Sequence, residues 1–262
     1  IIKVKITVDH QSREAAIDFT GTSPQFQGNY NAPTAVCLAA VLYVFRCLVN
    51  DNIPLNEGCL KPLNVIVPEK SIISPEYPAA VIAGNTEVGQ CITDALFGAL
   101  RKLASSQGTV NNFVYGNEVH QNYETICGGT GAGPNHPGAS AVHSHMTNTK
   151  MTDPEVLEQR FPVRVDSFAI RRGSGGKGKF SGGDGVIREI TFLEDMKVTL
   201  LTSHRHTDPY GLDGGNSGLR GRNAVRRKNG QVEELNGNDE TDMRPGDTFI
   251  METPGGGAYG SA

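Results

Sequence analysis

Apolar and polar residues alternate near the start of the chain. Residues 4–8 alternate, a turn follows at 9–12, and the alternation resumes over 15–19. A period of two is typical of a strand with one buried face, so this stretch predicts a β-hairpin. Two further apolar runs bounded by prolines, 63–67 and 79–83, are also predicted to be strands.

Two longer apolar stretches have the spacing of buried helices. Residues 34–49 are apolar on nearly all sides and follow Pro33, which suits the first turn of a helix. Residues 91–103 carry apolar side chains three and four positions apart, which predicts one buried helical face. We therefore expect the two main helices of the molecule near 34–49 and 91–103.

Short strand-like runs take over later in the chain, separated by glycine-rich segments. Asp153 is suited to cap a short helix with Pro154 in its first turn, and Asn229-Gly230 is a hairpin signal. The expected strands are 163–170, 186–193, 197–202, 224–227 and 248–252.

The distribution of glycine divides the chain into two portions. The chain has 262 residues and 32 glycines, of which 24 lie in residues 128–262. We predict an α+β fold of mixed β-sheets. It consists of an α+β portion, 1–127, that holds both helices, and a glycine-rich, β-rich portion, 128–262. The chain begins within a strand-like alternation and without a methionine, so we expect one continuous fragment of a larger protein.

The charge and the cysteines of the chain argue against several classes of protein. With 24 basic and 28 acidic residues the net charge is −4, which argues against binding to nucleic acid or to an anionic membrane. No apolar run reaches the ~18 residues of a membrane span. The basic cluster at 220–228 is followed by acidic residues at 233–240, which predicts a salt-bridged surface hairpin. The five cysteines are scattered singly, as expected for reduced thiols in a cytoplasmic protein.

Two glycine-rich runs superficially match nucleotide-binding motifs. Residues 173–179 have phosphate-loop spacing, but Phe180 stands where Ser or Thr should hold magnesium, and no helix is predicted to follow. We interpret this run as a connection between two strands. The run 128–133 also precedes no helix. The backbone N–H groups of Gly129, Gly131 and Gly133 are candidates for an oxyanion hole, and purely structural tight turns are the alternative.

Polar residues near these runs are candidates for catalysis. His143-Ser144-His145 and His204-Arg205-His206 share a spacing that, on a strand, places both imidazoles on one face, as a metal site requires. The alternative is histidines that hold loops by hydrogen bonds. Asn85 and Glu87 follow an apolar run, where Glu87 is either a general acid or base or a carboxylate that complements the dipole of the following helix.

Several runs, in order, resemble the hydantoinase B/5-oxoprolinase family over essentially the whole chain. The runs are Phe19–Pro24, Gly28–Pro33, Tyr123–Thr125, Gly128–Gly133, Val142–Thr149, Asp153–Glu155, Arg171–Gly176, Gly182–Arg188 and Thr253–Gly257. The runs 142–149 and 171–176 are most similar to ATP-dependent 5-oxoprolinases, and 253–260 resembles the carboxyl end of the family's B component.

The resemblance implies a division of labour between components. In the family, an A component binds ATP with magnesium and phosphorylates the lactam oxygen of 5-oxo-L-proline, and the B component opens the ring. For this chain it implies no bound cofactor. A divalent metal would belong to an upstream part of the B component, and the partners would be the ATP-binding A-type component, the upstream half of the B component and further copies of the parent. The fragment is then expected to be inactive alone.

The resemblance and the residue types together define the candidate site. The expected catalytic residues are His143, His145, Asn148, Glu124 and Glu87, and the expected substrate-binding residues are Asn85, Gly129, Gly131 and Gly133, with no metal ligand. Three alternatives stay open: an N-methylhydantoin amidohydrolase, a ketone carboxylase subunit, or a non-catalytic assembly scaffold.

Overall fold

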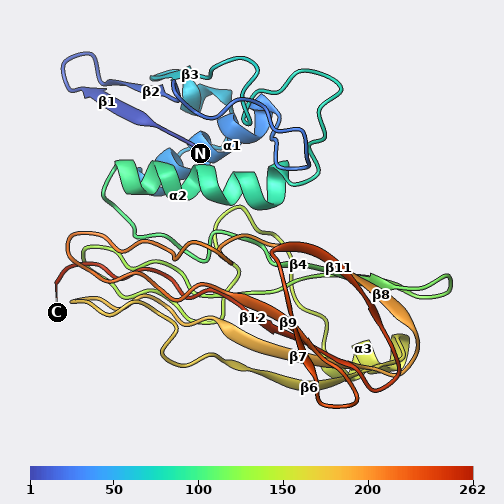
Figure 1. Ribbon diagram of the computed structural model, residues 1–262. Coiled ribbons are helices and arrows are strands. Elements are labelled where there is room, and N and C mark those ends of the chain that lie inside the picture. The colour runs from blue at the N-terminus through green and yellow to red at the C-terminus, as the bar shows by residue number, and fades with distance from the viewer. Residues whose placement is uncertain (262) are drawn as a thin grey trace. The chain divides into compact units, whose positions relative to one another are not determined.

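The computed structural model describes residues 1–261 and divides the chain into two compact units, Ile1–Lys102 and Leu103–Ala262 (Figure 1). The fold is α+β, with the second unit rich in strands, as expected. The boundary falls after Lys102, whereas the glycine content changes after Cys127. Two strands in between, β4 (Asn112–Gly116) and β5 (Gln121–Thr125), belong to the second unit and were not expected.

The first unit contains a three-stranded sheet in the order β1-β2-β3. The predicted hairpin forms, with β1 (Lys5–Asp9) antiparallel to β2 (Glu14–Asp18). Strand β3 (Leu63–Ile66) is also correctly predicted and lies parallel to β2. Ile17 is fully buried, so the alternation of β2 does mark the face turned to the core.

Two helices make up the rest of this unit's core. Helix α1 (Thr34–Leu48) begins after Pro33, as its sequence predicts, and α2 (Gly89–Ala99) ends a few residues earlier than expected. The rings of Tyr43 and Phe97 meet edge to face at 6.4 Å between centroids, which packs the two helices together. A π-helix, η2 (Gly84–Val88), leads directly into α2, and a short 3-10 helix, η1 (Glu57–Leu60), precedes β3.

The predicted strand at 79–83 is wrong. These residues form a turn and pair with no strand. Val81 and Ile82 are 39% and 67% exposed, so the apolar run is not a buried strand face. Periodicity alone cannot distinguish a short apolar run in a strand from one in a loop.

The second unit is a sandwich of two antiparallel sheets. One sheet has the order β10-β9-β12-β7-β6 and the other β11-β8-β4-β5. The expected strands are present, and a short helix, α3 (Pro154–Arg160), starts where predicted, capped by the Asp153 side chain. The strands not yet named are β6 (Val163–Ile170), β7 (Val186–Phe192), β8 (Met196–Leu201), β9 (Arg222–Arg226), β10 (Val232–Leu235), β11 (Asn238–Met243) and β12 (Thr248–Glu252).

Aromatic side chains fill the space between the two sheets. Phe113 of β4 stacks on Phe249 of β12 at 4.4 Å between ring centroids. Tyr115 meets Phe192 edge to face at 5.4 Å. Each contact joins one sheet to the other, and all four side chains are at most 1% exposed. Burying such rings is the main driving force for closing the sandwich.

Five irregular extended segments continue the sandwich at one end and pack backbone against backbone (Figure 1). We call them the glycine bundle; they are residues 104–107, 128–133, 174–185, 209–218 and 254–260. Gly256 donates to the carbonyl of Gly183, and Gly183 donates to that of Thr130. A Cβ on Gly256 would overlap the Thr130 carbonyl oxygen, so only glycine allows this approach. The run 173–179 lies in the connection between β6 and β7, as expected, and opens no helix.

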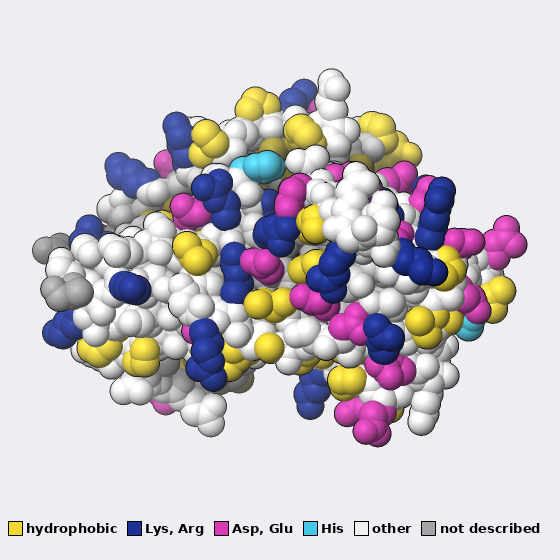
Figure 2. Space-filling view, turned by 60° about the horizontal axis from the view of Figure 1, so that its bottom comes forward, with side chains coloured by type: hydrophobic (Ala, Val, Ile, Leu, Met, Phe, Trp, Pro, Cys, Tyr) yellow, Lys and Arg dark blue, Asp and Glu magenta, His cyan; other side chains and the backbone are white. Residues whose placement is uncertain are grey.

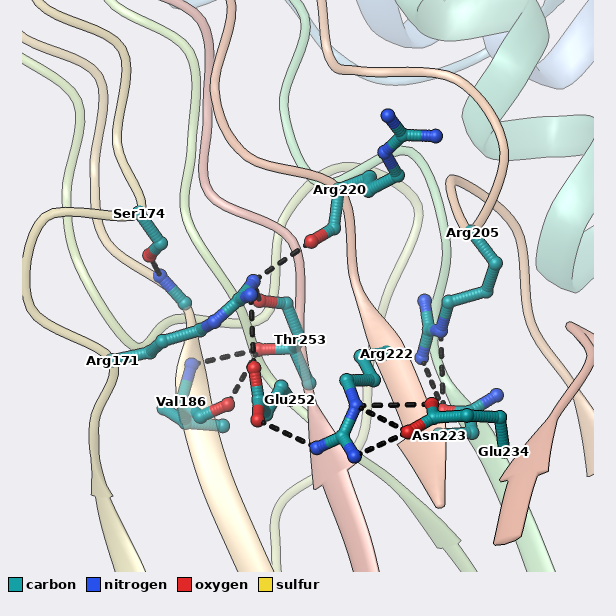
Figure 3. Close-up of polar contacts among 11 residues, drawn as sticks. Arg171, Ser174, Val186, Arg205, Arg220, Arg222, Asn223, Glu234, Glu252 and Thr253 are labelled. Atoms are coloured by element: carbon teal, nitrogen blue, oxygen red, sulfur yellow. Dashed lines mark hydrogen bonds and ion pairs between the residues drawn. The ribbon is translucent and has the colours of Figure 1, made fainter.

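Charged side chains form a paired surface network on this unit. Arg222 of β9 binds Glu234 of β10 at 3.0 Å from Nε, which confirms the predicted salt-bridged hairpin. Arg171 and Arg222 lie on either side of Glu252, at 2.9 and 3.2 Å (Figure 3). On the face drawn in Figure 2, Lys and Arg side chains are interspersed with Asp and Glu over the middle and right of the view. Such mixed charge leaves no broad basic stripe of the kind that binds nucleic acid on this face.

Among residues 1–261, none of the helices has the length and apolarity that crossing a bilayer requires. All five cysteines have free thiols, and burial raises the pKa of the Cys127 thiol to about 11. A thiol with so high a pKa stays protonated at neutral pH and is a poor nucleophile.

Candidate functional site

A buried serine and histidine meet beside the glycine bundle. Ser106 Oγ lies 3.0 Å from His145 Nε2, and the backbone N–H of Gly131 donates to the same Oγ at 3.1 Å. Ser106 is fully buried and His145 is 9% exposed. A hydroxyl and an imidazole at this distance can exchange a proton or fix each other's orientation, which is the geometry of many acyl-transfer sites.

Backbone hydrogen bonds on both sides fix the position of Ser106. Ala104 N–H donates to the Ala132 carbonyl at 2.9 Å, and Gln107 N–H donates to the Gly129 carbonyl at 2.8 Å. Residues 104–107 therefore run alongside the first glycine run. A Cβ on Gly131 would overlap the Ala104 carbonyl oxygen. Glycine at position 131 thus permits the close approach that brings its N–H to Ser106.

His145 lies in a loop, 142–149, that is tied down at both ends. Val142 and Gly128 exchange two backbone hydrogen bonds, at 2.9 and 3.1 Å, and Thr149 Oγ1 bonds to Thr125 Oγ1. Met146, directly after the histidine, has a φ of 58°. A non-glycine residue in this left-handed region costs about 1–2 kcal/mol, and such strain is often found at functional sites.

Burial determines the charge state of the histidine. It lowers the pKa of His145 to about 4, because desolvation disfavours the imidazolium. The ring is therefore neutral at physiological pH. A neutral imidazole can accept a proton at one nitrogen while it donates a hydrogen bond from the other.

The three proposed backbone donors all have acceptors within the unit. Gly129 N–H donates to the Pro254 carbonyl, Gly131 N–H to Ser106 Oγ, and Gly133 N–H to the His136 carbonyl, at 3.0–3.1 Å. The bond of Gly129 joins two segments of the glycine bundle, and that of Gly133 closes a local turn. Of the three, only that of Gly131 reaches a side chain of the candidate site.

The other two candidates of the same loop have different surroundings. His143 is partly buried, both of its ring nitrogens are shielded from solvent, and no hydrogen-bond partner for either lies among residues 1–261. Burial lowers the pKa of His143, so it too favours the neutral form. Asn148 is exposed. Neither histidine pair lies on a strand, so the expected alignment of two imidazoles on one strand face does not occur.

Glu124 is placed in the core of the sandwich. Arg188 Nη2 contacts both carboxylate oxygens, at 2.9 and 3.0 Å, and the two side chains are 3% and 1% exposed as residues. Burial raises the pKa of Glu124, and the Arg188 guanidinium opposes that shift. Because Glu124 lies on β5 and Arg188 on β7, the pair joins the two sheets.

Asn85 and Glu87 belong to the π-helix η2 in the first unit. Asn85 is exposed, whereas Glu87 is fully buried. Gln90 and Asp94 are also buried, and the spacing 87, 90, 94 places the three side chains on one side of η2 and α2. π-Helical turns are frequent at functional sites, which makes this polar row the second candidate of the molecule.

Two features bear on whether the described residues could hold a metal ion or a phosphate group. Within residues 1–261, no three His, Cys, Asp or Glu side chains lie close enough together to hold a metal ion. The one run with phosphate-loop spacing, 173–179, lies in the glycine bundle and its connection to β6, away from any helix start. This run therefore lacks the helix start that a phosphate loop uses.

Comparison with known proteins gives the family. The model of the hydantoinase B/oxoprolinase family matches residues 1–262. The chain belongs to the hydantoinase B/oxoprolinase family. It is 48% identical over 261 residues to 5-oxoprolinase 1 of Arabidopsis thaliana, which covers 100% of this chain and 21% of the relative. It is 44% identical over 259 residues to a 5-oxoprolinase of Dictyostelium discoideum, covering 99% of this chain and 20% of the relative.

A solved structure shares the fold. The crystal structure of an ATP-dependent caprolactamase from Pseudomonas jessenii superposes with a TM-score of 0.84 at 21% identity. The match covers 99% of this chain and 48% of that one. The chain thus spans about a fifth of the length of the 5-oxoprolinases it matches.

Ser106 is the one member of the candidate site that sequence reasoning missed. It lies in the run Ala104–Thr109, just after a helix and before β4, in a stretch with no motif of its own. The available signal was weak: small polar residues in a connection that is buried throughout. Its partner His145 is 39 positions away, and no sequence periodicity relates them.

Proposed function

We propose that this chain is a segment of the hydrolytic component of an ATP-dependent 5-oxoprolinase. The reaction converts 5-oxo-L-proline, ATP and water to L-glutamate, ADP and phosphate. The observation that carries the proposal is 48% identity to a 5-oxoprolinase along the full length of this chain. The matched region extends through both units, so it spans the positions of the candidate residues described above.

The chemistry requires a site that stabilises charge as the ring opens. An unactivated amide is a poor electrophile, and phosphorylation of the lactam oxygen makes its carbon open to attack. The site that follows must orient water and stabilise negative charge on oxygen at that carbon. It must also exclude bulk water. The buried pair of Ser106 and His145, with a neutral imidazole, supports this role.

Phosphorylation itself is assigned to another part of the parent protein. We propose an ATP-binding partner component or domain that holds ATP with magnesium, an upstream portion of the same component, and self-association of the parent. A divalent metal, where one is used, belongs to that upstream portion. The free thiols of this chain support a cytoplasmic location.

The decisive experiment uses the intact parent protein with ATP and magnesium. ADP and glutamate are followed in parallel with 5-oxo-L-proline, with N-methylhydantoin, and with acetone plus bicarbonate. We expect ADP release matched by glutamate formation with 5-oxo-L-proline alone. Turnover of either other substrate without 5-oxo-L-proline would overturn the proposed substrate.

A variant separates catalysis from a scaffold role. In His145→Gln the side chain keeps hydrogen-bonding capacity but loses the imidazole, so glutamate formation should fall at least about 100-fold while the protein stays assembled. Asn148→Ala tests the exposed candidate of the same loop, and loss of turnover with assembly intact would support a site role for it as well. Unchanged turnover in both variants would leave the segment as a scaffold.

A further inference from the structure

Two turns of the second unit enclose a cavity of about 700 Å³. The turns are residues 227–231, between β9 and β10, and residues 244–247, between β11 and β12. Strand β12 starts beside this cavity with Thr248 and ends with Glu252, after which the glycine bundle begins. The cavity therefore lies at the end of the sandwich away from the bundle. Its volume is within the range of small-molecule sites, about 300–1,000 Å³.

Arg227 ties the walls of this cavity together. Its Nη1 donates to the Asp247 carboxylate at 2.9 Å and to the Asp242 carbonyl at 2.7 Å. Its Nη2 donates to Thr241 Oγ1 at 3.1 Å and also binds the Glu233 carboxylate. The charge of this guanidinium is thus balanced by two carboxylates of the cavity itself.

Asp247 fixes the two turns to each other. The side chain is 5% exposed, and its Oδ1 accepts the backbone N–H of Lys228 at 2.9 Å. Its Oδ2 accepts the backbone N–H of Arg244 at 3.1 Å. The stem of Lys228 also packs against the second turn, since a Cβ on Gly246 would lie 3.0 Å from Lys228 Cδ. The backbone that carries each of these two cations is therefore held in place.

Two cationic groups of the cavity remain unpaired. Lys228 and Arg244 line it, and neither the ammonium of the first nor the guanidinium of the second has a hydrogen-bond or ion-pair partner among residues 1–261. We propose that this cavity binds a small oxyanion, a carboxylate or a phosphate group, between Lys228 and Arg244. A guanidinium can bind either group through two parallel hydrogen bonds, and an ammonium adds a point charge.

The acidic side chains of the cavity do not cancel this charge. Glu233 and Asp247 are bound to Arg227. Asp242 contributes its carbonyl, because the alternation of β11 places its side chain on the face opposite the buried Met243. On that outer face it lies across from Lys197 of β8. A positive charge therefore remains for an anion, and its attraction should weaken as salt is added.

The test measures how far a bound anion shields Lys228. The intact parent protein is treated with limiting acetic anhydride, and acetylation of each lysine is read by peptide mass spectrometry. Inorganic phosphate and L-glutamate are the two probes, each compared with sodium chloride at equal ionic strength. At about 10 mM a probe occupies most of a site with a Kd of about 1 mM, so acetylation of Lys228 should fall at least about threefold with one or both probes.

The two probes identify the class of ligand. Protection by phosphate alone assigns a phosphate-bearing ligand, and protection by glutamate alone assigns a carboxylate. Lys197 is an exposed lysine of the same unit that does not line the cavity, and its acetylation should be unchanged.

Arg244→Gln tests the second cation. The variant keeps the backbone N–H that bonds to Asp247, so the turn should persist, but protection of Lys228 should be lost. Arg160→Gln is the matched control, because it removes the same charge from an exposed residue at the end of α3, outside the cavity. Protection of Lys228 should be retained in this variant.

Three results would overturn the proposed site. They are equal acetylation of Lys228 with and without both probes, equal protection of Lys197, and protection that persists in Arg244→Gln. The site is separate from the pair of Ser106 and His145, and acetylation is read without turnover. A parent that forms no glutamate from 5-oxo-L-proline would therefore overturn the proposed function and leave the test of this cavity unaffected.

Discussion

In the second unit, the sandwich and the glycine bundle differ in how the space between neighbouring segments is filled. In the sandwich, large side chains such as Phe113 and Phe249 fill the space between two sheets. In the bundle, segments approach so closely that no Cβ fits at Gly129, Gly182 or Gly256, and backbone hydrogen bonds join them directly.

The comparison shows which of the two cores fixes the positions of its residues more exactly. A side-chain core tolerates volume-conserving changes, since neighbouring side chains can repack. A backbone core has no side chains to adjust, so each atom added must displace main chain. Ser106 and the loop that carries His145 are attached to the bundle, which places the candidate site on the more rigid of the two.

The largest effect should come from adding one methyl group to the bundle. In Gly256→Ala the new Cβ would overlap the Thr130 carbonyl, so we expect a loss of more than about 4 kcal/mol in the free energy of unfolding. Urea unfolding measures it. Gly173→Asn is the control, because Gly173 has open space around it and asparagine tolerates its φ of 81°. Equal losses in both variants would contradict the picture of a backbone core.

The next effect concerns the sandwich and its buried ion pair. Glu124→Gln removes the charge that pairs with Arg188 and leaves a buried guanidinium uncompensated, so we expect a loss of about 3–4 kcal/mol. Glu234→Gln weakens a pair at the surface and should cost less than about 1 kcal/mol. Thermal unfolding of both variants gives the comparison. A Glu124→Gln variant that unfolds like the wild type but loses turnover would instead make Glu124 a catalytic group.

The smallest effect is the pH dependence due to His145. In the unfolded chain histidine titrates near about 6.5, whereas burial lowers the pKa of His145 to about 4 in the folded protein. Between these values only the unfolded state binds the proton. The stability contribution is therefore full above about pH 6.5 and declines as the pH falls toward about 4, by about 3 kcal/mol in total.

Comparison of wild type with His145→Gln isolates this term. The free energy of unfolding of each protein is measured by urea denaturation from about pH 7 to about pH 4.5. The difference between the two proteins should change by up to about 1.4 kcal/mol per pH unit, which is the slope for uptake of one proton on unfolding. A difference that stays constant over this range would show that the folded protein accommodates a charged His145.

Local sequence pattern determined most of the secondary structure. The hairpin of β1 and β2, both main helices, the capped start of α3 and the strands of the larger sheet follow from alternation, helical spacing, Pro33 and Asp153. These signals act between residues close in sequence, so they are readable without the fold. The prediction of a strand at 79–83 was wrong because apolar runs also occur in exposed turns. Strands β4 and β5 were not predicted. The sequence of β5, Gln-Asn-Tyr-Glu-Thr, is polar, so it has no alternation of apolar residues. The charge of its buried Glu124 is balanced by Arg188, which lies far away in the sequence.

The candidate site was predicted only in part, and tertiary structure decided its form. Residue type and family resemblance singled out His145 and Gly131, but nothing in the sequence joined them to Ser106. The same reasoning could not show that Glu124 pairs with Arg188, or that the N–H groups of Gly129 and Gly133 bond within the unit. These are contacts between segments far apart along the chain. Their partners are set by how the backbone segments stack, and that depends on steric fit across the whole unit.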